Sequence, residues 1–247
     1  MNLKEEILNI VTLAGYRTSV ELERTVEALE EIVRAERESD IKSVLEWLNK
    51  RRTECSADVA EIHLQDVAGW GADANTGNIT HHSGGFFSVI GVRTTGAGER
   101  EVASWDQPIV KQDKSSVSGV ICQRRNGVMR YLFHGKFEPG NLHKIQISPA
   151  LQATPSNLER THAGRRPRLA EYFGDEGKGK VLKMVEAAED GGRFYKKTIR
   201  NILVEVDEAE EVPITGEYMW LTRPQIMKLL MVDGAMNSLA RNVCALL

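Results

Sequence analysis

The sequence predicts an α+β protein, because helical and strand patterns occupy different stretches of the chain. Apolar residues recur at helical spacing through residues 1–52. From Asp58 to Thr154 the pattern changes to strands, and Asn126-Gly127 between two of them is a strong signal of a two-residue hairpin. Helical patterns return toward the C-terminus. We therefore expect a β-sheet body with helices before and after it.

The first 52 residues predict three helices, and Asp40 is expected to cap the third. Each has an apolar stripe of the kind that packs, either on the body of the protein or on a second subunit. We predict a helical extension over residues 1–52 and a main module over residues 53–247. The predicted strands span 86–92, 101–110, 117–125, 128–137, 145–154 and 199–206. The later helices are predicted at 181–188, from a Thr222–Gln225 capping box to about Gly234, and at 237–246.

Composition narrows the class of protein. The chain has 247 residues, 41% hydrophobic and 27% charged, with a formal charge of −3, which is typical of a soluble globular protein and not of a nucleic-acid binder. No apolar run approaches the ~18 residues that cross a membrane, and no secretory signal is visible. Cys55, Cys122 and Cys244 lack the spacing of a zinc site or a disulfide framework. We expect a cytoplasmic protein with reduced thiols.

The segment from His134 to Asn157 contains unusually many hydrogen-bonding side chains at strand-like spacing. Pro139-Gly140 and Pro149 constrain the backbone between them. The pattern predicts a surface that binds a polyhydroxylated, charged small molecule, and the alternative is a polar sheet edge with loops. The side chains predicted to bind are Lys136, Glu138, Asn141, Gln146, Ser148, Gln152, Thr154, Ser156 and Asn157.

This segment resembles motifs of the nucleotide-diphosphate-hexose 2,3-dehydratases of deoxysugar biosynthesis, Q-A-K-x-E-P-G-N followed by x-Q-L-S-P-T-V-Q-A-T-x-S-N. The run from His81 to Phe87 is similar to the family's H-x-S-G-x-F-F, and the run from Trp105 to Ile109 is similar to its W-x-Q-P-I. The motifs occur in the same order, and the resemblance covers roughly residues 44–247.

The resemblance implies a Nudix-like mixed β-sheet flanked by helices. The diphosphatase signature G-x5-E-x7-R-E-x2-E-E is absent from the sequence, so metal-dependent diphosphate hydrolysis loses its main support. Members of the family usually fuse two copies of the module, whereas this sequence shows one. A homodimer would restore the two-module arrangement.

The implied reaction is loss of water across C2 and C3 of a nucleotide-linked 4-keto-6-deoxyhexose, such as dTDP-4-keto-6-deoxyglucose. The C4 ketone makes the C3 hydrogen acidic, so the site needs a base, an acid and donors for the enolate oxygen. The reaction is redox-neutral and needs no nicotinamide or flavin, and no G-x-G-x-x-G fingerprint is present. We expect no cofactor.

Glu138 is the first candidate for acid–base catalysis, beside the constrained Pro139-Gly140. Lys136 is a candidate for stabilising the enolate or a phosphate, or for a simple ion pair with Glu138 on one face of a strand. His134 stands where the family usually has Gln, so it is either an acid or base, a tolerated substitution or a sign of another substrate. His81 matches a family histidine, although a structural role is the alternative.

Two basic clusters are candidates for binding a diphosphate, because arginine forks suit phosphate oxygens. The first contains Arg160, Arg165, Arg166 and Arg168, and the second contains Arg193, Lys196, Lys197 and Arg200. Tyr195 or Trp220 can stack on a nucleobase, and Asn201 follows Arg200 in a family motif. The alternative is solvated surface charge, above all for the first cluster.

Two further functions stay open. The departures from the family at His134, Gly135 and Gly85 are consistent with an enzyme on the same scaffold that acts on a substrate other than a sugar nucleotide. A non-catalytic nucleotide-sugar-binding module that pairs with another protein through its N-terminal helices is the third hypothesis.

Overall fold

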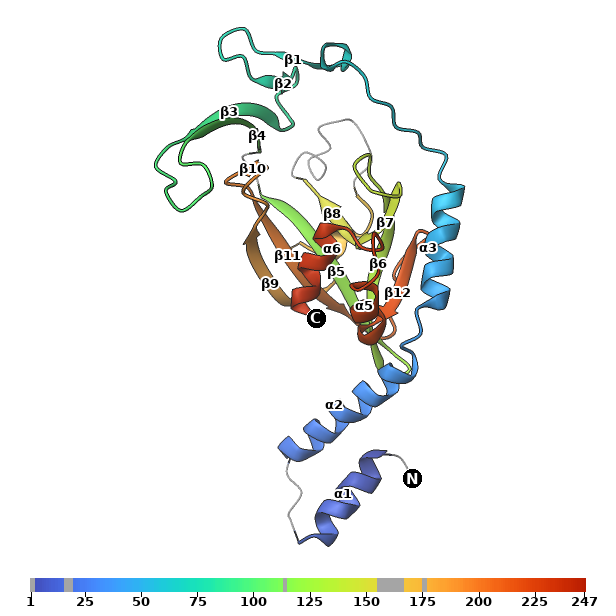
Figure 1. The fold of residues 1–247 in the computed structure, drawn as a ribbon. Coiled ribbons are helices and arrows are strands. Elements are labelled where there is room, and N and C mark those ends of the chain that lie inside the picture. The colour runs from blue at the N-terminus through green and yellow to red at the C-terminus, as the bar shows by residue number, and fades with distance from the viewer. Residues whose placement is uncertain (1–2, 16–19, 113–114, 155–166, 175–176) are drawn as a thin grey trace.

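The computed structural model describes residues 3–15, 20–112, 115–154, 167–174 and 177–247. Figure 1 shows a seven-stranded sheet with helices around it, a smaller sheet beside one end, and two N-terminal helices that project from the other end. Helices and strands are both abundant, so the α+β prediction is confirmed.

The N-terminal region forms three helices, as predicted: α1 (Leu3–Leu13), α2 (Val20–Arg37) and α3 (Lys42–Glu54). An ion pair between Lys4 and Glu27 joins α1 to α2. The C-terminal half of α2 reaches the body, where Glu31 accepts a hydrogen bond from the Met129 amide at 3.1 Å. The cap prediction for α3 was wrong by one residue, since Ile41 is the N-cap, although the Asp40 carboxylate still accepts from the Lys42 amide at 3.3 Å.

Helix α3 packs directly on the body. Val44 and Leu48 are each 1% exposed and belong to the main hydrophobic core. The Trp47 indole donates to the Gly216 carbonyl at 2.9 Å, which attaches α3 to the segment before residue 218. The division after residue 52 stays a prediction, and this packing favours a boundary near residue 40.

The smaller sheet has five strands in the order β1-β2-β3-β4-β10. The first four pair antiparallel, and β10 pairs parallel with β4. Because β10 comes from a distant part of the chain, it joins this sheet to the segment that follows β9. The strands are β1 (Trp70–Ala72), β2 (Ile79–His81), β3 (Ser88–Thr94), β4 (Trp105–Lys111) and β10 (Phe194–Tyr195).

The larger sheet has the order β12-β6-β5-β11-β9, with β7 paired to β6 and β8 paired to β5. The β5–β11 pair is parallel and the others are antiparallel. Its central hairpin turns at Asn126 (φ 53°) and Gly127 (φ 74°), the left-handed pair that a two-residue turn requires, so this prediction is confirmed. The strands are β5 (Ser116–Arg125), β6 (Val128–Phe137), β7 (Ile145–Pro149), β8 (Leu151–Ala153), β9 (Lys180–Ala188), β11 (Thr198–Val206) and β12 (Tyr218–Thr222).

The helix predicted at 181–188 was wrong, because this segment is strand β9. Its lysine, leucine and alanine residues are good helix formers, but β11 offers a full antiparallel ladder of hydrogen bonds along its edge. Pairing with the sheet therefore overrides local propensity. Almost all of β9 is exposed, as an edge strand allows.

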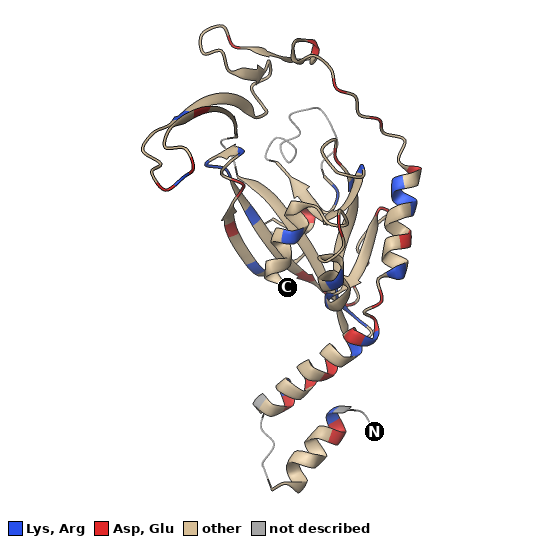
Figure 2. Cartoon of the chain, in the orientation of Figure 1, with Lys and Arg blue, Asp and Glu red and all other residues tan. Residues whose placement is uncertain are grey.

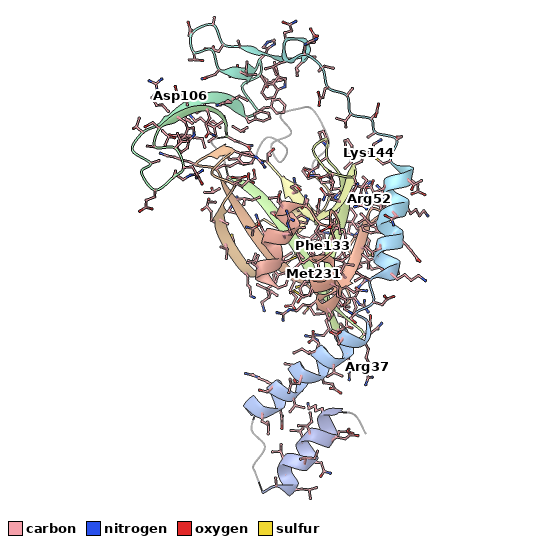
Figure 3. All side chains as sticks on the ribbon, viewed as in Figure 1. Arg37, Arg52, Asp106, Phe133, Lys144 and Met231 are labelled. Carbon is pink, nitrogen blue, oxygen red and sulfur yellow. The ribbon has the colours of Figure 1, made fainter. Side chains whose placement is uncertain are left out.

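Two hydrophobic clusters hold the body together. The first gathers α3, α5 (Arg223–Leu229) and α6 (Ser238–Val243) around Phe133, which Figure 3 labels within the body. The Thr222–Gln225 capping box of α5 is confirmed, but the helix ends at Leu229, before Gly234. The second cluster lies around Tyr172 and Leu169. These two cores fix the positions of β6, β7, β8 and α6 relative to one another.

Charged residues occur along helices and strands throughout the molecule, and acidic residues recur along α2 (Figure 2). Within the described ranges, none of the helices has both the length and the hydropathy needed to cross a membrane.

The packing of α3 leads to a stability prediction. Leu48→Ala should lower the free energy of unfolding by about 2–5 kcal/mol, because it leaves a cavity in the main core. Leu13→Ala, on the 78% exposed Leu13 of α1, should change it by less than about 0.5 kcal/mol. Urea unfolding followed by circular dichroism measures both, and equal effects would mean that α3 is not part of the cooperative unit.

Candidate active site

A cavity of about 990 Å³ opens where three parts of the chain meet. One wall is the end of β6 and the loop to β7, another is the segment from the end of β9 to β11, and the third is α6 with the residues before it. Its polar lining contains Glu138, Asn141, Gln146, Gln152, Glu189, Asp190, Lys197, Asn237, Ser238, Arg241 and Asn242.

The Glu138 carboxylate lines this cavity and accepts from three donors. Its Oε1 accepts from the Gln152 amide at 2.6 Å and from Lys136 Nζ at 3.2 Å. Its Oε2 receives a longer contact from Asn237 Nδ2 at 3.4 Å. The donors come from β8, β6 and the N-cap of α6, so three elements fix one carboxylate. One of the three donors is a cation, and charge-assisted hydrogen bonds are stronger than neutral ones.

Asn237 connects the site to the fold, and the sequence analysis did not single it out for this role. Its Nδ2 also donates to Ser148 Oγ at 2.9 Å, and its Oδ1 accepts from the Ala240 amide at 2.8 Å to cap α6. The signal was present, because Asn is a preferred N-cap residue before a predicted helix. Only the tertiary structure shows that the other end of this amide meets Glu138.

The loop from β6 to β7 is held by hydrogen bonds within the loop and by one to the segment before α6. Asn141 Nδ2 donates to the carbonyls of Lys136 and Lys144, both at 3.1 Å. Gln146 Nε2 donates to the Gly234 carbonyl at 3.1 Å, which ties the loop's return strand to the segment before α6. These predicted site residues therefore shape the cavity wall through their backbone partners.

Helix α3 supports the same wall from the other side. Arg52 donates to the Ile145 carbonyl at 3.1 Å and to the Gly234 carbonyl at 2.8 Å. The Lys144 ammonium donates to the Ala57 carbonyl at 2.8 Å. Figure 3 shows Arg52 and Lys144 on the side of the body next to α3.

A second ion pair lies in the cavity wall that the segment from β9 to β11 forms, at the end of the β9–β11 ladder. Lys197 Nζ is 3.1 Å from Glu189, and the two side chains are only 9% and 10% exposed. The ammonium also lies 4.7 Å from the centre of the Phe194 ring. Lys197 was predicted as part of a basic cluster, whereas Glu189 was missed because its partner lies across the strands.

The five-stranded sheet contacts this wall through Gln107. The Trp105 indole donates to Gln107 Oε1 at 2.7 Å, and Gln107 Nε2 donates to the Gly192 carbonyl at 3.0 Å. The Arg193 carbonyl in turn accepts from the Val110 amide at 2.9 Å. The W-x-Q-P-I sequence thus fixes the turn that carries the residues between Glu189 and Phe194.

Three polar side chains with buried oxygen atoms form a row across the sheet, and the first of them contacts Glu138. Gln152 of β8 is paired in register with Ser118 of β5, which is paired with Asn201 of β11. Gln152 Oε1, Ser118 Oγ and Asn201 Oδ1 have no hydrogen-bond partner among the residues that the structure describes. Buried polar atoms are normally satisfied, so this row of unpaired oxygen atoms is unusual. In the part of the chain that the structure describes, no three His, Cys, Asp or Glu side chains are grouped to hold a metal ion.

Comparison with known proteins identifies the family. The sequence profile described as NDP-hexose 2,3-dehydratase matches residues 41–247. The chain belongs to the NDP-hexose 2,3-dehydratase family. Two curated relatives have the name dTDP-4-dehydro-6-deoxy-alpha-D-glucopyranose 2,3-dehydratase. The protein from Saccharopolyspora spinosa is 38% identical over 80% of this chain and 40% of the relative, and that from Amycolatopsis orientalis is 33% identical over 83% and 44%.

This 2,3-dehydratase family chain thus spans about two fifths of the length of the curated relatives it matches. Among solved structures, a Nudix hydrolase from M. smegmatis matches 57% of this chain and 91% of its own, at 17% identity and a TM-score of 0.36. A C. elegans Ap4A hydrolase matches 56% and 98%, at 18% identity and a TM-score of 0.34. Both likenesses are distant.

His134 lies apart from the cavity of this 2,3-dehydratase family member. Its ring stacks on Tyr218, with centroids 4.4 Å apart and planes 12° apart. Burial lowers the pKa of His134 to about 4, because desolvation disfavours the charged imidazolium. The structure therefore brings Glu138 and Lys136 together but leaves His134 in a packed, neutral setting.

Other predicted residues are also outside the cavity lining. Lys136 and Ser148 contact lining residues, and Asn201 is paired across the sheet with Ser118, whereas four more have different surroundings. His81 is in β2, where its Nδ1 is 2.8 Å from Ser83 Oγ and its ring contacts Phe86. Trp220 packs near the second core, with the Arg125 guanidinium 4.7 Å from its ring. Arg200 is exposed on β11, and Tyr195 is partly exposed next to Phe194 of the lining. Their roles stay predictions.

The remaining predicted site residues lie near the segment 155–166, which is outside the described residues, or within it. Thr154 lies directly after β8 and is half-buried. Arg168 is exposed. Ser156, Asn157, Arg160, Arg165 and Arg166 lie outside the described residues.

The buried His134 leads to a prediction about pH. Its pKa of about 4 is below the ~6.5 of an unfolded histidine, so the unfolded chain binds more protons in this window. The stability that neutral His134 contributes is therefore complete above pH 6.5 and is lost as pH falls toward 4, by about 3 kcal/mol in total. His134→Gln should flatten this part of the urea-unfolding profile, whereas His63→Gln, on the exposed His63, should not.

Proposed function

We propose that this chain catalyses loss of water across C2 and C3 of a nucleotide-linked 4-keto-6-deoxyhexose, as the names of its relatives describe for those proteins. The observation that carries the proposal is the Glu138 carboxylate, fixed by three donors inside the cavity. A base that removes a proton from carbon must be held in place, and this arrangement supplies that condition.

Glu138 is the group that takes the C3 proton. The electrons of the C3–H bond delocalise onto the C4 oxygen, and the resulting enolate then expels the C2 hydroxyl, which takes up a proton and leaves as water. Lys136, 3.2 Å from Glu138, supplies positive charge near this reacting end.

The same cavity offers a group for the nucleotide end. Arg241 of α6 lines it as a cation suited to a diphosphate. The volume of about 990 Å³ is at the upper end of ordinary ligand pockets, which run to about 1,000 Å³. A sugar nucleotide is a large ligand for which this size is appropriate.

Replacing the base should abolish turnover without abolishing binding. Glu138→Gln should lower kcat on dTDP-4-keto-6-deoxyglucose by about 10²–10⁴-fold, because general base catalysis typically contributes that factor. It should keep the rise in melting temperature that thymidine diphosphate produces, since a ligand that binds only the native state stabilises it. Mass spectrometry of the product and thermal melting measure the two effects.

The matched control is Glu46→Gln on the exposed face of α3, which should leave both unchanged. Normal turnover by Glu138→Gln would remove Glu138 from the mechanism. A melting temperature that thymidine, uridine and other nucleoside diphosphates all leave unchanged would favour an enzyme with a different class of substrate. Binding without turnover by the wild type would favour a non-catalytic nucleotide-sugar-binding module.

We also propose that the protein forms a homodimer through α1 and α2. Ile10, Leu13, Val20 and Ile32 are large apolar side chains that remain exposed on these helices. The helices project from the body, so little of the chain covers them (Figure 1). Exposed apolar residues grouped in this way are typical of a surface that packs against a partner.

Light scattering tests this proposal. The wild type should have the mass of a dimer at micromolar concentration, and Ile10→Glu/Leu13→Glu should shift it to a monomer because the apolar surface becomes charged. Met231→Glu, on an equally exposed methionine of the body, should stay dimeric. A monomeric wild type would contradict the proposal.

A further inference from the structure

We propose that Lys197 is a second catalytic residue, which gives a proton to the departing C2 hydroxyl, and that Glu189 positions its ammonium. The inference rests on the proposed dehydration. Glu138 accounts for the proton that leaves C3, but loss of hydroxide from C2 needs a proton donor as well. Lys197 lines the same cavity from the end of the β9–β11 ladder.

The geometry holds Lys197 on two sides. Glu189 is 3.1 Å from its ammonium nitrogen, and the Phe194 ring centre is 4.7 Å away. The backbone joins the same two residues, since the Glu189 amide donates to the Lys197 carbonyl at 3.0 Å. A proton donor held in this way has little freedom to turn away from the cavity.

A cross-strand ion pair with a purely structural role explains this arrangement less well. Such pairs usually lie at the surface, where their charges stay hydrated, and β9 is exposed along most of its length. Yet Lys197 and Glu189 are 9% and 10% exposed. Removing both charges from water costs free energy, so a buried ion pair is weak evidence for a stabilising role. Both side chains line the cavity that also contains Glu138.

The proton transfers balance without an added reactant. Glu138 takes the proton from C3, and Lys197 gives one to the C2 oxygen as the C2–O bond breaks, so water leaves with its electron pair. The first product is an enol with a double bond between C2 and C3 and a hydroxyl on C3. As this enol becomes the 3,4-diketone, its hydroxyl proton returns to the Lys197 amine and Glu138 protonates C2. Within this ion pair the lysine nitrogen carries the N–H protons and the carboxylate accepts, so Lys197 and not Glu189 is the donor.

Lys197→Arg gives the sharpest test. Arginine keeps the positive charge and the partner of Glu189, but it does not give up a proton in proteins. In deuterated water, this variant should still exchange the C3 hydrogen of dTDP-4-keto-6-deoxyglucose. It should lose water about 10²–10⁴-fold more slowly than the wild type. Lys197→Met should behave in the same way if it folds, and Glu189→Gln should lower kcat with little change in KM. Mass spectrometry of recovered substrate and product separates exchange from water loss.

Each outcome decides between roles. Lys180→Met, at the exposed start of β9, should match the wild type in both measurements. Full water loss by Lys197→Arg would overturn the inference while leaving the proposed dehydration intact. Weaker binding of thymidine diphosphate to Lys197→Met, with turnover unchanged at saturation, would show a phosphate contact and overturn it as well. A wild type that neither exchanges C3 hydrogen nor releases water would instead refute the proposed function on which the inference rests.

Discussion

The carboxylate of Glu138 is the point on which the rest of the site depends. An ionised side chain facing a cavity is stable only if several donors compensate its lost hydration, and here they come from Lys136, Gln152 and Asn237. Each donor is fixed by a different element, so β6, β8 and α6 must all be in place for the carboxylate to be held. The two hydrophobic cores meet this requirement by fixing those elements to one sheet.

The same logic explains why elements distant in sequence converge on the cavity. Helix α3 holds the β6–β7 wall through Arg52, and the five-stranded sheet holds the opposite wall through Gln107. Asn237 uses one amide both to cap α6 and to bind the site. The catalytic proposal for Glu138 and that for Lys197 therefore require the intact body. In both, a charged group is fixed in advance by paired partners, which lowers the cost of ordering it during reaction.

Sequence reasoning succeeded where the physical signal is local. The Asn126-Gly127 turn and the Thr222–Gln225 capping box are confirmed, because a few adjacent residues determine the backbone there. It failed at β9, where helix-forming residues pair with β11 instead. Pairing with a distant strand is not visible in the segment itself. The family motifs pointed to the correct family and to most of the polar residues around Glu138.

The sequence by itself determined the α+β class, the family, the polar stretch after His134 and the candidate base Glu138, because these depend on local patterns and motifs. Only the tertiary structure decided which polar residues share a cavity. It placed His134 against Tyr218 and outside the lining, and it brought Glu189, Lys197 and Asn237 into it. The physical reason is that strand pairing and core packing, which join residues far apart in the chain, decide which side chains meet.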